Sequence, residues 1–132
     1  SASLAAKANL GSGRGAIALR FSIKQIGDRY VFGAAGPTLW DCSGLTMRAF
    51  QAAGVSLPHS AAAQSGYGKS IPFNKLQPGD LVFFGKHHYI SHVGIYIGSG
   101  RMVNAPRPGA RVKVEGFSGS FGSLAFYGAR RI

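Results

Sequence analysis

Two segments in the first half of the chain carry apolar residues at the period of an α-helix. Over residues 15–27 the apolar positions follow a 3-4-3 spacing, at Ala16, Leu19, Ile23 and Ile26. Over residues 42–53 a second apolar face is formed by Leu45, Ala49, Ala52 and Ala53. Asp41 precedes this segment as a good N-cap residue, and Gly54 follows it where a C-cap glycine belongs. The spacing therefore predicts two amphipathic helices.

The second half of the chain changes to short β-type runs. After residue 80 the runs read LVFFG, SHVGIYIG, RMVNAP, VKVEGF and LAFYGARR, separated by Gly, Pro or Ser. Between the two halves, YVFGAAGPT predicts an irregular loop and LPHSAAAQSGYG has room for a short helix. Helices followed by a run of strands favour an α+β fold, with N-terminal helices packed on an antiparallel β-sheet.

The length of 132 residues fits one domain with its own hydrophobic core. Residues 1–13, rich in Ala, Ser and Gly, are expected to form a flexible lead-in, and residues 14–132 the folded domain. No apolar run approaches the roughly 20 residues of a membrane-spanning helix. The N-terminus also lacks the uninterrupted apolar core of a signal peptide. These observations favour either a protein that stays in the cell or a mature or excised fragment.

The composition adds a strong positive charge. Fifteen Lys and Arg residues against four Asp and Glu residues give a net charge of +11. Such a surface attracts polyanions, including nucleic acid, anionic lipid and anionic cell-wall polymers. Because the basic residues are scattered and form no dense block or helical stripe, we expect no specific nucleic-acid recognition. We interpret the charge as a targeting field.

Cys42 is the single cysteine of the chain, which excludes an internal disulfide. A lone cysteine is most often an inert buried thiol. Cys42, however, lies in the first turn of the second predicted helix, where free N–H groups and the positive end of the helix dipole favour a thiolate. We therefore interpret Cys42 as a candidate nucleophile whose thiol pKa is lowered.

A thiol nucleophile also needs a base, and the chain has four histidines. His59 and the pair His87–His88 fall in predicted loops. His92 lies in the strand pattern ISHVGIYIG, on the same face as Gly94 and Tyr96. There, beside the small Gly94, it is placed to meet the N-terminus of the Cys42 helix. A surface histidine on a strand is the simpler interpretation of the same pattern.

Asn104, in the run RMVNAP, lies on the next predicted strand. Its side-chain oxygen can orient the imidazole of a catalytic histidine, although a polar residue at the end of a strand is common. Metal binding is the rival use of the histidines and the cysteine. One cysteine and a His–His pair match no zinc spacing, and acidic ligands are scarce. We therefore expect no metal and no other cofactor.

Three stretches together resemble the NlpC/P60 family of cell-wall peptidases: YVFGAAGPTLWDCSGLT, LQPGDLVFF and SHVGIYIGSGRMVNAP. The resemblance extends from Ala16 to Ile132, and it is specific because the DCSG, PGDL and HVGIY motifs agree in order and spacing. It implies a papain-like fold and thiol-dependent hydrolysis of bacterial peptidoglycan stem peptides, between D-glutamate and meso-diaminopimelate. It also implies a secreted or cell-wall-associated protein whose signal peptide is absent from this chain.

The resemblance assigns roles to six residues. The family's nucleophile matches Cys42, its general base matches His92, and its third catalytic residue, most often a histidine, matches Asn104. An amide can orient an imidazole at that position, as in papain-like triads. The remaining three residues match substrate-facing positions: Tyr30, whose hydroxyl is expected near the oxyanion or substrate carbonyl, and Asp41 and Ser43 on the amine-binding side.

One further position departs from the family pattern. His59, in PHSAAAQ, stands where many relatives have arginine, so contacts in the substrate pocket are expected to differ.

Other functions stay open at this point. A catalytically silent peptidoglycan-binding module would use the same groove, and a phage lysin or injected antibacterial toxin would use the same site. A basic nucleic-acid-binding domain is a further alternative, but no base-reading or stacking motif is present. We expect a monomer whose partner is bacterial peptidoglycan.

Overall fold

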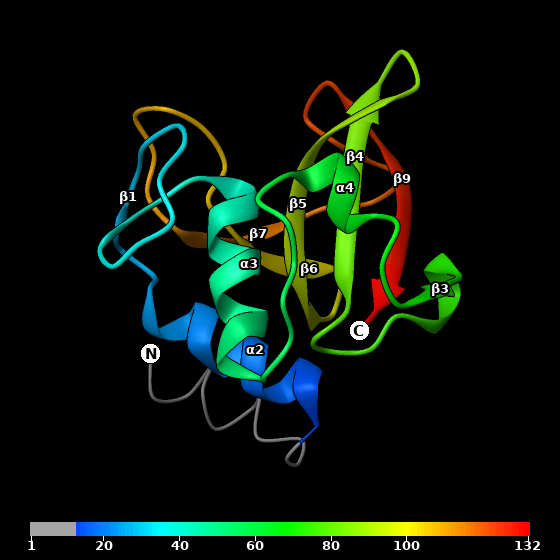
Figure 1. Cartoon of the computed structure of the whole chain (residues 1–132). Coiled ribbons are helices and arrows are strands. Elements are labelled where there is room, and N and C mark those ends of the chain that lie inside the picture. The colour runs from blue at the N-terminus through cyan, green and yellow to red at the C-terminus, as the bar shows by residue number, and fades with distance from the viewer. Residues whose placement is uncertain (1–12) are drawn as a thin grey trace.

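The helices of the structure lie together on one side of a β-sheet (Figure 1). The structure is a computed structural model and describes residues 13–132, so all but the last residue of the lead-in predicted for residues 1–13 lies outside the described residues. Helices α2 (Arg14–Lys24) and α3 (Cys42–Ala52) occupy the two segments whose period predicts them. Helix α4 (Ala61–Gln64) is the short helix expected in LPHSAAAQSGYG, and a 3₁₀ turn, η1, covers Phe73–Lys75.

Glycines with positive φ follow both long helices. Gly54, at φ 82°, follows α3 as the sequence predicts, and Gly27, at φ 100°, follows α2. Glycine adopts this left-handed conformation without the strain that a Cβ atom would introduce. The apolar spacing predicts a helix that continues to residue 27, but residues 25–27 form a turn. Helix α2 therefore ends at Lys24 and not at residue 27.

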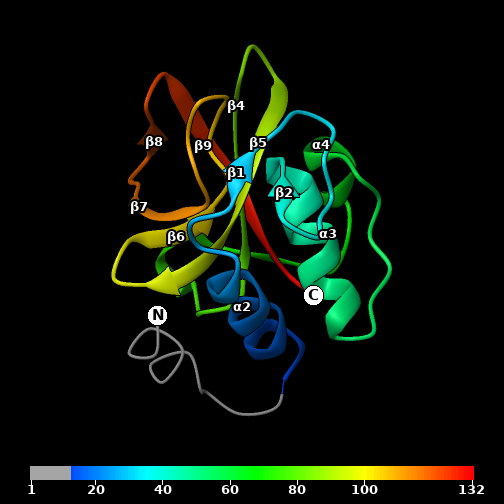
Figure 2. The ribbon, with the colours of Figure 1, turned by 90° about the vertical axis from the view of Figure 1, so that its left-hand side faces the viewer.

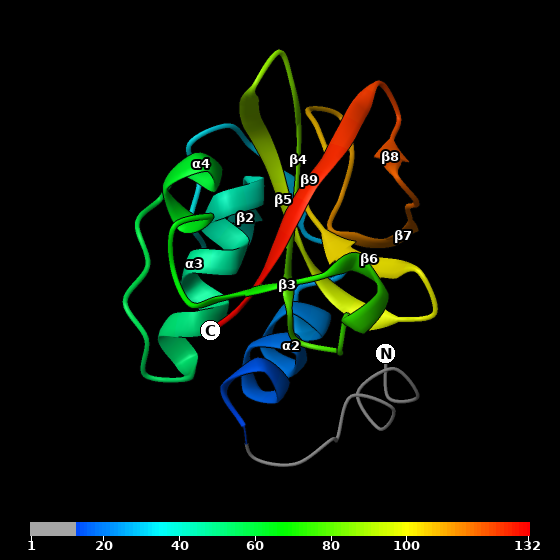
Figure 3. The same ribbon diagram turned by 90° about the vertical axis from the view of Figure 1, so that its right-hand side faces the viewer.

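Seven strands form the main sheet, which is antiparallel throughout. The order of the strands is β3–β9–β4–β5–β6–β7, and β8 also pairs with β9. Their bounds are β3 Lys69–Ile71, β4 Leu81–Lys86, β5 Tyr89–Gly98, β6 Arg101–Asn104, β7 Lys113–Gly116, β8 Ser120–Phe121 and β9 Leu124–Arg131. The five β-type runs after residue 80 thus become β4, β5, β6, β7 and β9, and the α+β prediction is confirmed. Figure 3 shows β9 beside β4, with β3 crossing near its end.

A small second sheet lies outside this main sheet. Strands β1 (Arg29–Tyr30) and β2 (Leu39–Trp40) pair in parallel over two residues each. The segment YVFGAAGPT, predicted to be wholly irregular, therefore begins in a strand at Tyr30. Two-residue strands carry too little alternation for a period to be recognised in the sequence.

Apolar side chains cover both faces of the main sheet. Between sheet and helices, one cluster contains Leu19 of α2, Phe50 of α3 and Val93 of β5, all essentially buried. The strand alternation sends Phe84 and Met102 to the opposite face, where a second, largely aromatic cluster surrounds them. Figure 2 shows α3 on one side of β5 and strands β7 and β8 on the other. One face of the sheet thus packs on the helices, and the other face carries the aromatic cluster.

Asp80, in the PGDL motif, joins the turn before β4 to the end of β9. Its carboxylate accepts two hydrogen bonds from Arg131, Nε to Oδ1 at 2.8 Å and Nη2 to Oδ2 at 2.8 Å. It also accepts the backbone N–H of Gln77 at 2.9 Å. Asp80 is only 2% exposed, so the paired guanidinium is what keeps its negative charge stable there.

We predict that Asp80→Asn lowers the free energy of unfolding by about 3 kcal/mol, because it leaves Arg131 without its charged partner. This change is at the lower end of what is expected for breaking a buried ion pair, because the Arg131 side chain is partly exposed to water. Chemical denaturation measures the change. Arg130→Ala on the same strand is the matched control, since its hydrogen bond to Gly68 is exposed, and it should cost less than about 0.5 kcal/mol. Equal effects of the two substitutions would contradict the assignment.

Candidate active site

Asp41 fixes the start of helix α3. Its Oδ1 atom accepts the backbone N–H of Gly44 at 2.7 Å, which is the N-cap bond that the sequence predicts. Its Oδ2 atom accepts the N–H of Gly33, in the β1–β2 loop, at 2.9 Å. The first residue of the helix is Cys42, so its thiol stands beside the unpaired N–H groups of the first turn.

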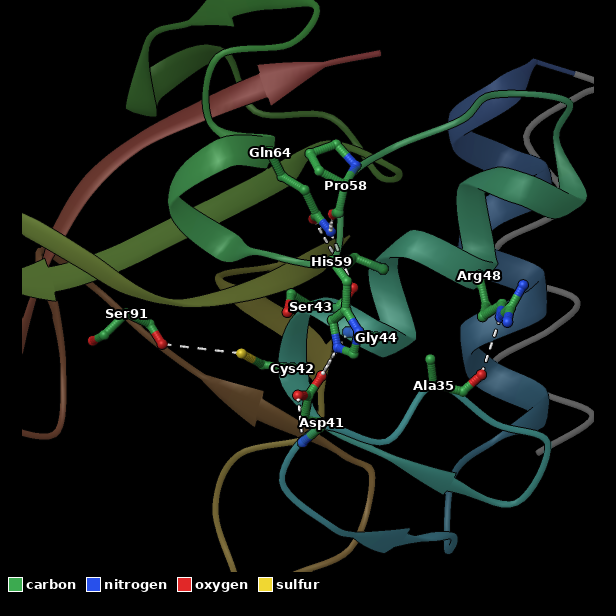
Figure 4. A network of polar contacts seen from close by, with 12 residues as sticks. Ala35, Asp41, Cys42, Ser43, Gly44, Arg48, Pro58, His59, Gln64 and Ser91 are labelled. Atoms are coloured by element: carbon green, nitrogen blue, oxygen red, sulfur yellow. Dashed lines mark hydrogen bonds and ion pairs between the residues drawn. The ribbon is translucent and has the colours of Figure 1, made fainter.

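Four of the six predicted site residues line one pocket of about 370 Å³. They are Tyr30, Asp41, Cys42 and Ser43. Within this pocket, the Cys42 sulfur lies 4.0 Å from the carbonyl oxygen of Ser91 on β5 (Figure 4). The pocket therefore joins the start of α3 to the beginning of the strand that carries His92.

His92 and Asn104 form a buried hydrogen-bonded pair on the adjacent strands β5 and β6. The Nε2 atom of His92 lies 2.8 Å from Oδ1 of Asn104. His92 is 4% exposed and Asn104 is fully buried. The structure thus brings these two predicted residues into contact. His92 directly follows Ser91, whose carbonyl oxygen lies beside the Cys42 thiol.

The surroundings of Asn104 define which ring nitrogen of His92 carries the proton. The Asn104 amide nitrogen donates to the carbonyl of Lys113 and to Oε1 of Glu115, each at 3.2 Å. Both of these oxygens only accept, so the amide oxygen must face His92. Because that oxygen also only accepts, Nε2 of His92 must be the protonated nitrogen. In the neutral ring the lone pair then lies on Nδ1, the nitrogen available as a base.

Aromatic rings enclose His92. Phe121 stacks on the imidazole with a centroid distance of 5.2 Å and an interplanar angle of 12°, and Phe84 lies at 6.2 Å. The interpretation of His92 as a surface histidine is therefore wrong. The same face of β5 is covered by the aromatic cluster, and Gly94 leaves room there for Met102 of the neighbouring strand. The small size of Gly94 does not serve the approach of helix α3.

Burial keeps both candidate catalytic groups uncharged. It raises the pKa of the Cys42 thiol to about 11, with a further increase from the Asp41 carboxylate included in that value. Hydrogen bonds from the backbone amides of Val93, Ser43 and Cys42 act in the opposite direction but do not prevail. Burial also lowers the pKa of His92. The prediction of a lowered Cys42 pKa is therefore wrong, because desolvation outweighs the helix N-terminus.

Tyr30 and His59 are the other ionisable residues at the pocket. Burial raises the pKa of Tyr30, and its electrostatic coupling to Cys42 and Asp41 raises it further, so its hydroxyl stays a hydrogen-bond donor. His59 Nε2 lies 2.7 Å from Oδ1 of Asp41 (Figure 4). His59 therefore belongs to the wall of the pocket and contacts the cap residue of α3.

Several residues of the site carry no signal in the sequence. Gln64 is fully buried and donates to the carbonyls of Ser43 at 3.0 Å and Pro58 at 2.9 Å, which ties α4 and the His59 loop to α3. Phe32, in the β1–β2 loop, and Tyr89, at the start of β5, line the pocket and remain 86% and 65% exposed. A pattern search finds none of them because each acts through contacts made only in three dimensions.

Two further observations concern residues 13–132 as a group. Among them, no three His, Cys, Asp or Glu side chains gather in a way that would hold a metal ion. Their helices are also all too short or too polar to cross a membrane.

Comparisons with solved structures identify the class of the fold. The structure is similar to NlpC1 from Trichomonas vaginalis, with a TM-score of 0.84 and 28% identity, covering 92% of this chain and 45% of that one. It is also similar to the NlpC/p60 domain of peptidoglycan hydrolase SagA, with a TM-score of 0.78 and 32% identity, covering 89% of this chain and 98% of that one. The fold is the papain-like α+β fold of these domains.

Comparisons of sequence identify the family. The NlpC/P60 family model matches residues 27–131, and the chain belongs to this family. It is 46% identical to the probable endopeptidase p60 of Listeria monocytogenes over 97 residues, which are 74% of this chain. It is 45% identical to a probable endopeptidase of Mycobacterium bovis over 93 residues, which are 70% of this chain. The chain spans only 20% of the length of the first relative and 24% of the second.

The raised thiol pKa predicts how Cys42 responds to pH. Because the protonated thiol dominates below the folded pKa, alkylation by iodoacetamide should be slow near about pH 6 and should accelerate steadily as the pH rises above about 8. Asp41→Asn should shift this profile to lower pH, since it removes a negative charge while keeping an N-cap oxygen. Mass spectrometry of the alkylated protein measures the rates.

Asp28→Asn is the control for this experiment. Asp28 accepts a hydrogen bond from the Trp40 indole, so the substitution removes one carboxylate without touching the cap of α3. Its profile should match that of the wild type. A rate that already reaches its plateau near about pH 6 would show a preformed thiolate and contradict the prediction.

Proposed function

We propose that this domain is a cysteine endopeptidase that hydrolyses the stem peptides of bacterial peptidoglycan. The observation that carries the proposal is the placement of Cys42 at a helix N-terminus, on a pocket, beside the strand that holds the hydrogen-bonded His92–Asn104 pair. Nucleophile, base and orienting group are the three parts that acyl transfer by a thiol requires. The names of the similar proteins, probable endopeptidases and a peptidoglycan hydrolase, support the same substrate class.

The reaction begins with the neutral pair. As the Cys42 sulfur attacks the peptide carbonyl carbon, its proton passes to Nδ1 of His92, and the carbonyl electrons move to the oxygen. The N–H groups at the start of α3 and the Tyr30 hydroxyl stabilise this oxyanion. His92 then gives the proton to the leaving amine, and a thioester with Cys42 remains. Water, activated by His92, hydrolyses the thioester and restores the thiol.

Asn104 supports both proton transfers. Its amide oxygen holds Nε2–H of His92, so the imidazole keeps one orientation in its neutral and charged forms. An asparagine therefore serves at the position where a histidine is more common in the family.

The proposed bond lies between D-glutamate and meso-diaminopimelate. Asp41 and Ser43 belong to the wall of the pocket that would receive the amine side of the substrate. The His59 imidazole, in contact with Asp41, belongs to the same wall and presents a ring where an arginine would present a guanidinium. We place the protein in the secreted or cell-wall-associated fraction, where its net charge of +11 favours contact with an anionic wall.

Digestion of purified muropeptides tests the activity. The wild type should split tripeptide or tetrapeptide stems at the D-γ-glutamyl bond, each cleavage adding one water to the summed product mass. Cys42→Ala should reduce turnover by about a thousandfold or more, because the covalent step is lost. Mass spectrometry identifies the products, and thermal unfolding confirms that the variant is folded. Intact stems after digestion with folded wild-type protein would favour the silent wall-binding module.

The charge has a separate consequence for wall binding. Binding of the Cys42→Ala variant to intact peptidoglycan should weaken as salt is added, because screening shortens the electrostatic range to about 8 Å at physiological ionic strength. Cleavage of small soluble muropeptides by the wild type should change much less. Pelleting assays and product analysis give the two dependences. Equal salt sensitivity of both would count against a targeting role for the charge.

A further inference from the structure

Glu115 is one of four acidic residues in a chain with fifteen basic ones. Each of the other three forms a definite structural bond: Asp28 to the Trp40 indole, Asp41 to the start of α3, and Asp80 to Arg131. Glu115 lies on β7, next to β6 in the sheet, and its contact is with the candidate catalytic Asn104. Its position therefore calls for an explanation in terms of the site.

The Glu115 carboxylate is held between Asn104 and two cations. Its Oε1 atom accepts from the Asn104 amide nitrogen at 3.2 Å. Its Oε2 atom lies 3.6 Å from a guanidinium nitrogen of Arg107 and 3.8 Å from the ammonium nitrogen of Lys113. The carboxylate side chain is 20% exposed, so its charge acts on the site with less screening than a surface carboxylate.

The contact with Glu115 helps to define the orientation of the Asn104 amide. The amide nitrogen has two acceptors on the β7 side, Glu115 and the Lys113 carbonyl, and this turns the amide oxygen to His92. If the amide turned over, it would place its oxygen against the Glu115 carboxylate. A carboxylate repels that arrangement more strongly than any neutral side chain would.

The charge of Glu115 also matters when His92 takes up a proton. Burial disfavours the imidazolium, while the carboxylate two hydrogen bonds away raises the pKa of His92 and Arg107 lowers it. Glu115 and Arg107 are the charged side chains that act on the ring, and Asn104 is its hydrogen-bond partner. Phe121 of β8 stacks on the ring, and Phe84 of β4 lies beside it at a tilt. Glu115 is thus the acidic group placed to stabilise the charged ring.

We propose that Glu115 is a positioning residue that extends the His92–Asn104 pair of the site to a hydrogen-bonded chain of three, His92–Asn104–Glu115. Its carboxylate holds the Asn104 amide with its oxygen towards His92 and stabilises the imidazolium that forms during acyl transfer. The inference rests on the proposed peptidase function for its effect on turnover. Its effect on the state of His92 is independent of any substrate.

Two substitutions of Glu115 and one of Arg107 test the proposal. In nitrogen-15 NMR of the whole chain, wild-type His92 should show the Nε2–H form. Glu115→Ala should mix the two neutral forms and lower the pKa of His92. Glu115→Gln, which keeps the shape of the side chain, should lower the pKa but disturb the ring less. Arg107→Gln is the matched control, because it removes a charge of opposite sign and should raise the pKa of His92.

Turnover of a soluble muropeptide provides the second measurement. Glu115→Ala should lower kcat by about tenfold with little change in KM, because a hydrogen bond to a charged group is lost away from the substrate. Glu115→Gln, which keeps an amide oxygen for Asn104, should lower kcat by less. Thermal unfolding checks that each variant is folded, and Glu115→Gln keeps the test open if Glu115→Ala is not.

Two results would overturn the positioning role. One is an unchanged His92 ring state in both Glu115 variants, and the other is a changed ring state with wild-type kcat. If the wild type cleaves no muropeptide at all, the peptidase proposal fails, and the NMR titration still decides whether Glu115 controls His92.

Discussion

The pocket depends on one buried carboxylate, that of Asp41. It accepts the N–H of Gly44 in helix α3 and the N–H of Gly33 in the β1–β2 loop, and it contacts His59 ahead of helix α4. Three segments of the chain, the β1–β2 loop, the start of α3 and the loop ahead of α4, therefore meet at the two oxygen atoms of this carboxylate. Because Asp41 directly precedes Cys42, the same bonds that close the pocket also fix where the thiol stands. An uncapped α3 would lose both at once.

This arrangement has an electrostatic consequence for the thiol. The carboxylate that positions Cys42 also opposes its ionisation, and burial of the thiol and of His92 acts in the same direction. The site therefore holds a neutral thiol and a neutral imidazole. In the proposed reaction, charges separate only when a substrate carbonyl accepts the sulfur, and the imidazolium that forms then needs a neighbouring group to stabilise it. The Asn104–Glu115 side of His92 is where the structure offers that stabilisation.

Much of the fold could be predicted from the sequence because the elements that matter are long enough to show a period. Helix α3, its Asp41 cap and the five strands after residue 80 are examples. The pair β1–β2 and strands β3 and β8 were not predictable, since two or three residues do not establish an alternation. At the site, too, contacts between single residues could be predicted only in part. The contact of Asn104 with His92 follows from neighbouring strands, whereas the contact with Glu115 requires the β6–β7 register.

The burial of His92, and its effect on the His92 pKa, also could not be predicted from the sequence. A period of two places His92 on the face of β5 opposite Val93, but it does not say what covers that face. The covering side chains, Phe84 and Phe121, come from β4 and from the two-residue strand β8. Without them His92 would be a surface histidine with an ordinary pKa. The aromatic layer therefore turns a strand histidine into a buried base.

The small number of acidic residues affects both the net charge of the domain and the bonds in its interior. All four carboxylates are committed to internal bonds: Asp28 to Trp40, Asp41 to the start of α3, Asp80 to Arg131 and Glu115 to Asn104. Two of these carboxylates also pair with basic side chains, Asp80 with Arg131 and Glu115 with Arg107 and Lys113. Four carboxylates cannot neutralise fifteen basic side chains, so the net charge stays strongly positive. The same composition that makes the domain attractive to an anionic polymer thus leaves each acid as a specific structural part. Two of the four carboxylates, Asp41 and Glu115, contact residues of the candidate site, whereas Asp28 and Asp80 form structural bonds elsewhere in the fold.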